Sequence, residues 1–360
     1  MLKMPCCRIW LLPFVLICMT WMPSVASPVR LSPAAQISLL TCAPGAETYA
    51  LFGHSALRVS DPALGLDQVY NYGTFDFQTP HFYWRFLRGD LRYFLSAVPF
   101  TTFCRGYAQE GRAVSEQVLA LQPEEVQRLY TQLETTLHSP AKYYRYQFFA
   151  DNCSTRLFAL LTSSVNEPLQ LDSTQQASPP TYRQLLAPYL APAPWVQLGM
   201  NIGLGLPTDR PTTFRQRLFL PVELQQALAH ATRQAQPLVA QQRQIVVPAN
   251  SSASPTGLTP MGLLLGWVVL SILIWQWLSS PAWLLRMNAR VLFTVTGLLG
   301  CLLTGLSLGS LHTPVQANYQ ILWLLPSHLL VGLVRSRAWW RYYAVVAIVC
   351  SSSVACLPHN

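Results

Sequence analysis

The chain has 360 residues, of which 51% are hydrophobic and only 11% are charged, and its mean hydropathy is +0.26. Soluble globular proteins carry roughly 25% charged residues, so this composition excludes a disordered chain and disfavours a wholly soluble enzyme. The net charge of +9 does not indicate a nucleic-acid partner, because residues 28–260 carry only +2 and the other seven charges lie beside apolar segments.

The first residues of the chain, 1–27, have the layout of a signal peptide. Lys3 and Arg8 precede the apolar stretch 9–20, and small residues follow near Val25 to Ser27. We therefore expect residues 28–235 to be exported across the membrane. An uncleaved N-terminal anchor is the alternative.

The exported region alternates strand-like and helix-like patterns, which predicts an α+β domain over 28–235. Apolar, aromatic and β-branched runs bounded by turn residues favour strands, and apolar residues at helical spacing favour helices. The expected strands are 36–43, 49–60, 68–77 and 113–121, with 143–149 as a strand or loop; the expected helices are 122–137, 153–163, and two near 181–190 and 221–235. Residues 236–260 are rich in Gln, Pro and Ser, which predicts a flexible linker.

Four apolar stretches in the last hundred residues predict a transmembrane domain over 261–360. The expected spans are about 261–280, 291–311, 318–334 and 342–357. The intervening loops 281–290 and 335–341 carry all five arginines of this region, whereas the turn 312–317 carries no Lys or Arg. By the positive-inside rule the arginine-bearing loops are cytoplasmic, so the turn and residues 28–260 face the other side.

Cys153 is the first candidate for chemistry, because it follows Asp151 and Asn152 at the predicted start of a helix. A helix N-terminus presents free N–H groups and positive potential, and both stabilise a thiolate nucleophile. The same amides can hold the oxyanion of an acyl-transfer reaction. The alternative is a buried core residue or half of a disulfide with Cys42 or Cys104, since exported thiols tend to pair.

His54 and Asn71 are the candidate base and orienting residue for this thiol. His54 lies in the apolar sequence FGHSALRV, where an unpartnered imidazole is costly to bury. A Cys–His pair needs a third group to orient the ring, and Asn71 on the next predicted strand can supply it. Tyr70 and Tyr72 compete with Asn71 for that place, because alternation along a strand decides which side chain faces the site. An ordinary core histidine and an edge asparagine are the alternatives.

Further polar residues are candidates for substrate or oxyanion support. Arg156 lies one turn after Cys153 and is a candidate to bind a phosphate or carboxylate, or to form a surface salt bridge. Asn152, Ser154 and Tyr72 complete this group, with Asn152 also expected as a helix cap. His312 and Asn318 flank the turn before the third predicted span. They are candidates to touch a lipid head group at the membrane surface, or to lie in a simple exposed loop.

Several of these segments together resemble a known family. YALFGHSALRV, YNYGTFDF, YRYQFFADNCSTRL and HTPVQANYQILWLLP look like the Lnb-type lipoprotein intramolecular acyltransferases, over most of 36–235 and part of 305–330. The resemblance implies a circularly permuted papain-like domain, similar to lecithin:retinol acyltransferases, in which the histidine precedes the cysteine. Carried over to this chain, His54 is the base and Cys153 is the nucleophile. The resemblance assigns no role to Asn71, which is a candidate from its place on the predicted strand alone.

The resemblance implies a thiol-dependent acyltransferase on the periplasmic side of a bacterial inner membrane. The expected reaction moves an acyl chain from a lipoprotein or phospholipid donor to the amino group of a lipoprotein's N-terminal cysteine, with no cofactor and no metal. The aromatic residues between Tyr70 and Phe103 are expected to line an acyl groove or to form ordinary core. Two rival functions remain: a cysteine peptidase or amidase acting on cell-wall peptides, and a non-catalytic envelope assembly protein.

Overall fold

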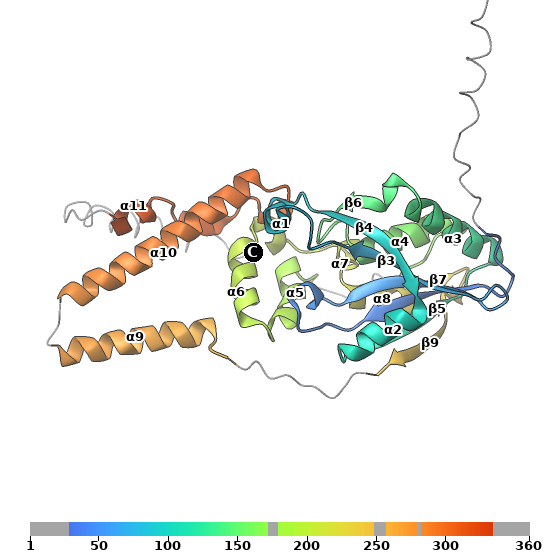
Figure 1. Ribbon diagram of the computed structural model, residues 1–360, viewed down its shortest axis with the longest axis horizontal. Coiled ribbons are helices and arrows are strands. Elements are labelled where there is room, and N and C mark those ends of the chain that lie inside the picture. Colours follow the sequence, from blue (N-terminus) through green and yellow to red (C-terminus); the bar gives the residue numbers. More distant parts are fainter. Residues whose placement is uncertain (1–28, 172–178, 248–256, 279–281, 334–360) are drawn as a thin grey trace, which may run out of the picture. The chain divides into compact units, whose positions relative to one another are not determined.

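The computed structural model describes residues 29–171, 179–247, 257–278 and 282–333 (Figure 1). The predicted signal peptide and the predicted span 342–357 lie outside these residues. The described part divides in composition at the gap 248–256. An α+β domain precedes the gap, and apolar helices follow it.

A single antiparallel sheet of seven strands organises the α+β domain. The order of its strands is β6-β4-β3-β2-β1-β5-β9, and every neighbouring pair is antiparallel. The strands are β1 (Gln36–Cys42), β2 (His54–Asp61), β3 (Leu66–Thr74), β4 (Arg92–Pro99), β5 (Val114–Leu119), β6 (Tyr143–Arg145) and β9 (Val239–Val246). A separate two-stranded ribbon joins β7 (Thr232–Arg233) to β8 (Gln236–Pro237).

Helices cover both faces of the sheet, because side chains on successive residues of a strand point to opposite faces. On β1, Ile37 and Leu39 belong to the core shared with α3 and α4, whereas Leu40 and Cys42 belong to the core shared with α2. The helices of this domain are α1 (Phe82–Arg88), α2 (Phe100–Gln109), α3 (Pro123–Leu137), α4 (Cys153–Ser164), α5 (Tyr182–Leu190), α6 (Pro194–Gly203), α7 (Phe214–Arg217) and α8 (Pro221–Ala229). A third apolar cluster joins α5 to residues near 149 and 219.

Local sequence explains where the central helices begin. Pro123 occupies the first turn of α3, and the side chains of Gln122 and Glu125 form a reciprocal capping box. Asn152 caps α4 in the same way with Thr155. Asn152 before Cys153 and Thr155 after it therefore fix the start of α4, and with it the position of the thiol.

The predicted linker begins too early. Residues 239–246 form β9, an edge strand that pairs with β5, so the folded domain extends at least to Val246. Gln-rich sequence is typical of linkers, but an edge strand needs only backbone pairing and tolerates exposed polar side chains. Arg243 of this strand donates to the buried carboxylate of Glu116 at 2.6 Å, which ties β9 to the sheet.

The apolar C-terminal region contains two helices long enough to span a membrane, α9 (Pro260–Trp277) and α10 (Ala282–Gly309). The prediction of a loop over 281–290 is wrong. Arg286 and Arg290 lie inside α10, because no Pro or other helix-breaking residue follows Ala282 in this stretch. The third predicted span, 318–334, is also not one helix. Its described part is a 3₁₀ turn (Tyr319–Leu322) followed by α11 (His328–Leu333), with Pro326 between them. The total of four spans stays a prediction.

Candidate active site

Cys153 is the first residue of α4, and its side chain is almost fully buried. Asn152 Oδ1 accepts the amide of Thr155 at 3.0 Å, and the amide of Arg156 donates to the carbonyl of Asn152. The amides of Cys153 and Ser154 precede these two bonds and have no partner within the helix. The thiol therefore lies where the helix presents free N–H groups and positive potential.

His54 begins β2, and Asn71 lies on the neighbouring strand β3. The Nε2 of His54 and the Oδ1 of Asn71 are 3.2 Å apart. The amide nitrogen of Asn71 donates to the carbonyl of Val69, so its oxygen is the atom that faces the imidazole. Asn71 thus accepts from Nε2–H and leaves Nδ1 to interact with the thiol. Tyr70 points away, because its hydroxyl donates to Glu134.

The hydroxyls of Ser55 and Ser154 meet at 2.9 Å, which brings the start of β2 against the start of α4. The imidazole of His54 and the thiol of Cys153 are near enough there for each group to shift the pKa of the other. Burial alone raises the pKa of Cys153, but the imidazolium of His54, the amide of Ser55 and the hydroxyl of Ser154 together hold that pKa below its usual value. Burial lowers the pKa of His54, but the nearby Cys153 thiolate and the bond to Asn71 raise it overall. Both directions favour a thiolate–imidazolium pair.

Two glycines allow the backbone to approach at this point. Gly73 has φ +97°, and a methyl group added to it would lie 3.8 Å from the Cβ of Cys153. Gly53 has φ +75°, and a methyl group there would lie 2.6 Å from the carbonyl oxygen of Cys42. Only glycine fits the backbone immediately before His54.

Gly53→Ala is expected to displace His54 and to slow alkylation of Cys153 at neutral pH about ten-fold, because the added methyl overlaps the backbone of β1. The measurement is the rate of iodoacetamide labelling of the purified full chain. Gly65→Ala is the matched control, since Gly65 also has positive φ but faces open space. Equal rates for the two variants would contradict this role of Gly53.

The remaining predicted support residues divide into two groups. Ser154 is fully buried beside the thiol, with its hydroxyl 2.9 Å from that of Ser55 and 3.9 Å from the sulfur of Cys153. Asn152 instead uses both amide protons on the carbonyls of Phe148 and Phe219, so its side chain acts as a helix cap and has no N–H left for an oxyanion.

Arg156 and Tyr72 form a separate cluster beside the site. The guanidinium of Arg156 pairs with Asp151 and lies 3.6 Å above the ring of Tyr144. The ring of Tyr72 is buried and packs edge-on against Tyr144. Arg156 thus forms a salt bridge within the domain, as the second of its two predicted roles expects.

Sequence reasoning missed three neighbours of the thiol: Ser55, Gly73 and Tyr146. The sequence offers one signal for Ser55: it directly follows the candidate base His54. It offers no comparable signal for Gly73 or Tyr146. Cys42, Cys104 and Cys153 are each free thiols, so neither a Cys42–Cys104 bridge nor a bridge to Cys153 is present. Burial raises the pKa of Cys42 to about 12, so this second thiol remains protonated. Among the described residues, no group of His, Cys, Asp and Glu is suited to hold a metal ion.

Comparison with known proteins assigns both halves of the chain. Residues 31–188 match the family model described as the Lnb N-terminal periplasmic domain, and residues 250–357 match the one described as the Lnb transmembrane domain. The chain belongs to the Lnb family. Searches of curated proteins and of solved structures found no match. Membership in the Lnb family makes this a membrane protein with a periplasmic domain, and it implies an enzyme related to lipoprotein N-acylation.

The two Lnb regions are hydrogen-bonded to each other through the turn that follows α10. His312 Nε2 lies 2.9 Å from the carbonyl of Phe86, and the side chain of buried Asn318 donates to the carbonyls of Ile202 and Gly203. The turn therefore lies on the same side as the periplasmic domain, in agreement with the charge distribution. His312 and Asn318 thus bind the domain's backbone, so the turn is not a simple exposed loop, and a role of this pair at a lipid head group stays a prediction.

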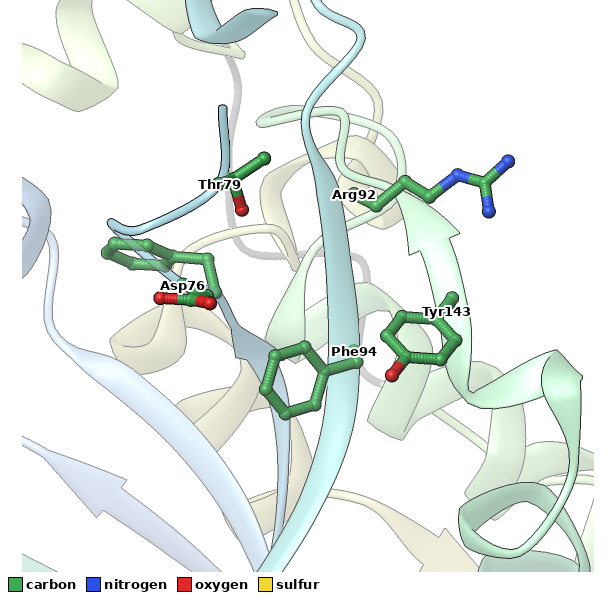
Figure 2. A pocket seen from close by; sticks show the side chains of 6 residues that line it. Asp76, Thr79, Arg92, Phe94 and Tyr143 are labelled. Atoms are coloured by element: carbon green, nitrogen blue, oxygen red, sulfur yellow. The ribbon is translucent and has the colours of Figure 1, made fainter. Parts of the chain in front are cut away.

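A cavity of about 580 Å³ lies between β4, β6 and the segment that follows β3. It is lined by Phe75, Asp76, Thr79, Arg92, Phe94 and Tyr143 (Figure 2). Figure 2 shows Phe94 between Asp76 and Tyr143, and the rings of Phe94 and Tyr143 are 5.8 Å apart. None of the lining residues belongs to the Cys153–His54–Asn71 group. Phe75 of the lining directly follows β3 and lies two residues beyond Gly73 in the chain.

Proposed function

We propose that this Lnb-family protein is a membrane-anchored acyltransferase that works through a thioester on Cys153. Its substrate is a lipoprotein, and the acyl chain moves from an ester oxygen of the lipid-bearing N-terminal residue to the amino group of that residue. The observation that carries the proposal is the meeting of β2 with the start of α4: the hydroxyls of Ser55 and Ser154, the residues that follow His54 and Cys153, are 2.9 Å apart, and His54 Nε2 lies 3.2 Å from the Oδ1 of Asn71. A phospholipid is the alternative acyl donor.

The chemistry follows from a thiolate–imidazolium pair. The Cys153 thiolate attacks the ester carbonyl, the C–S bond forms, and the C–O bond breaks as the imidazolium of His54 protonates the departing oxygen. The neutral imidazole then takes a proton from the amine as it attacks the thioester. The amide C–N bond forms, the C–S bond breaks, and the thiolate–imidazolium pair is restored.

The surroundings of the thiol suit acyl transfer more than hydrolysis. The amides of Cys153 and Ser154 are proposed to hold the oxyanion of each tetrahedral intermediate. Cys153 is part of the buried apolar core that also contains Tyr72, Tyr144 and Phe158. A site poor in water favours a bound amine over water as the acceptor.

The finer fold assignment belongs to the same proposal. An antiparallel sheet that carries the base and the orienting residue, with a helix that begins at the nucleophile, supports a papain-like domain. The histidine precedes the cysteine in this chain, which supports the circularly permuted form. We place the enzyme in the bacterial inner membrane as a multi-pass protein, with Cys153 on the periplasmic side.

The test is incubation of the purified full chain with a diacylated lipopeptide, followed by mass spectrometry of its N-terminus. The expected product has an amide-linked acyl chain and a mass unchanged by intramolecular transfer, so fragmentation must locate the chain on nitrogen. Parallel incubation with cell-wall peptides tests the peptidase or amidase alternative. Cleavage of those peptides without N-acylation of the lipopeptide would refute the proposal.

A further inference from the structure

Helix α1 exposes an unusual set of large apolar side chains. None of its seven residues is buried, and Tyr83 and Trp84 are 76% and 65% exposed. Phe86 and Leu87 are also exposed, and Arg85 and Arg88 lie in the last turn. Clustered apolar exposure of this kind marks a surface that another phase or partner covers.

The residues that follow α10 hold the end of α1. The amide of Leu311 donates to the carbonyl of Arg88 at 2.8 Å, and the hydroxyl of Ser310 donates to the carbonyl of Leu87 at 2.9 Å. The ring of His312 contacts the carbonyl of Phe86. Because α10 is a membrane-spanning candidate that ends at Gly309, these bonds place α1 at the level where the span leaves the bilayer.

Helix α6 is fixed at the same level by two other points of the chain. The indole of Trp195 donates to the carbonyl of Leu258, two residues before α9 begins. Asn318 binds the other end of α6, as described above. Helix α6 has no buried residue, and Trp195 and Leu198 are exposed. Two apolar helices of the periplasmic domain are thus tied to the periplasmic ends of α9 and α10.

A continuous series of aromatic contacts leads from α1 to the thiol. A methyl group added at Gly73, which would approach Cys153, would also lie 3.9 Å from the ring of Tyr146. Successive ring centroids from there are 4.4 to 5.9 Å apart, in the order Tyr146, Tyr93, Phe75, Phe82 and Tyr83. Of the aromatic residues between Tyr70 and Phe103, the buried ones are part of the core, whereas the exposed ones lie on α1 and just before it.

We propose that α1 and α6 lie in the head-group interface of the periplasmic leaflet, and that α1 is where a lipid acyl chain leaves the bilayer for Cys153. Tyr and Trp favour this interface, and Arg85 and Arg88 suit anionic head groups. The bilayer is the occupant that the hydrogen bonds to the ends of α9 and α10 favour over a protein partner. The use of the surface for an acyl chain rests on the proposed function, but its contact with lipid does not.

The test is photocrosslinking of the full chain in nanodiscs of phosphatidylethanolamine and phosphatidylglycerol. Trp84→p-benzoylphenylalanine and Trp195→p-benzoylphenylalanine report on the two helices, and Leu64→p-benzoylphenylalanine is the control. Leu64 is a comparably exposed apolar residue in the β2–β3 turn. Irradiation followed by intact-mass analysis counts phospholipid adducts on each variant.

We expect several-fold more phospholipid adduct at positions 84 and 195 than at position 64. A yield at either position no higher than at 64, or crosslinks to another protein chain in place of lipid, would overturn the proposal. Crosslinking requires no turnover, so an inactive Cys153 would refute the acyltransferase proposal and leave this result unchanged. Three exposed sites are used because each variant retains the core of the domain.

Discussion

Cys153→Ala is expected to lower the rate of lipopeptide N-acylation by about 10⁴-fold or more, since the substitution removes the atom that carries the acyl group. The fold is expected to survive, because alanine retains the Cβ and the cap of α4 is made by Asn152 and Thr155. The measurement is the initial rate of N-acylated product, determined by mass spectrometry with purified wild-type and variant chains.

Cys104→Ala is the matched control for this result. Cys104 is a free, partly exposed thiol on α2 of the same domain, and it packs against a different apolar cluster from the one that contains Cys153. Its rate is expected to equal that of the wild type. If Cys153→Ala retained a rate within ten-fold of the wild type while its helical content was unchanged, the thioester mechanism would be wrong.

His54→Ala is expected to move the pH dependence of Cys153 alkylation upward by more than about one pH unit. In the wild type the pKa of Cys153 is lowered, so the reactive thiolate is present above that lowered pKa and is lost as the pH falls through it. Without the imidazole, burial dominates and drives the pKa of the thiol above the value of about 8.5 for a free cysteine. Acyl transfer is expected to fall by about 10²-fold to 10⁴-fold as well, because the proton carrier is lost.

The measurement is the rate of iodoacetamide labelling between pH 5 and 10, followed on the tryptic peptide Tyr146–Arg156, which contains only this cysteine. Asn71→Ala is expected to produce a smaller upward shift, because it removes the orientation of the ring and not the ring itself. His138→Ala is the control histidine, since His138 lies on the exposed end of α3. A labelling profile for His54→Ala that coincides with that of the wild type would show that the two side chains do not interact.

Local patterns predicted those parts of the fold that local forces determine. Apolar, aromatic and β-branched runs placed β1, β3 and β5 within a few residues, and Pro123 with Glu125 marked the start of α3. The sequence patterns failed where backbone pairing between strands, and not amino-acid composition, decides the structure. β9 is polar and was predicted as a linker, yet it completes the sheet through backbone bonds to β5.

The candidate site was predictable in its residues and not in its contacts. Cys153 after Asn152 indicates a capped helix start, and His54 after Gly53 indicates a constrained histidine. Their proximity, however, depends on how α4 packs against β2, which no local pattern encodes. The same reason hid Ser55, whose hydroxyl meets that of Ser154 only when segments 99 residues apart come together. Tyr146 is near in sequence, but its place beside Gly73 depends on how the segment before α4 packs against the end of β3.

The most direct test of the mechanism is the detection of the acyl group on the enzyme itself. The full chain is incubated briefly with diacylated lipopeptide, quenched in acid and digested with trypsin, and the peptide Tyr146–Arg156 is weighed. We predict a mass increase of one acyl chain on this peptide that is removed by neutral hydroxylamine and is absent in Cys153→Ala. N-acylation of the lipopeptide that proceeds at the wild-type rate in Cys153→Ala, with no acyl group ever found on this peptide, would contradict the thioester mechanism.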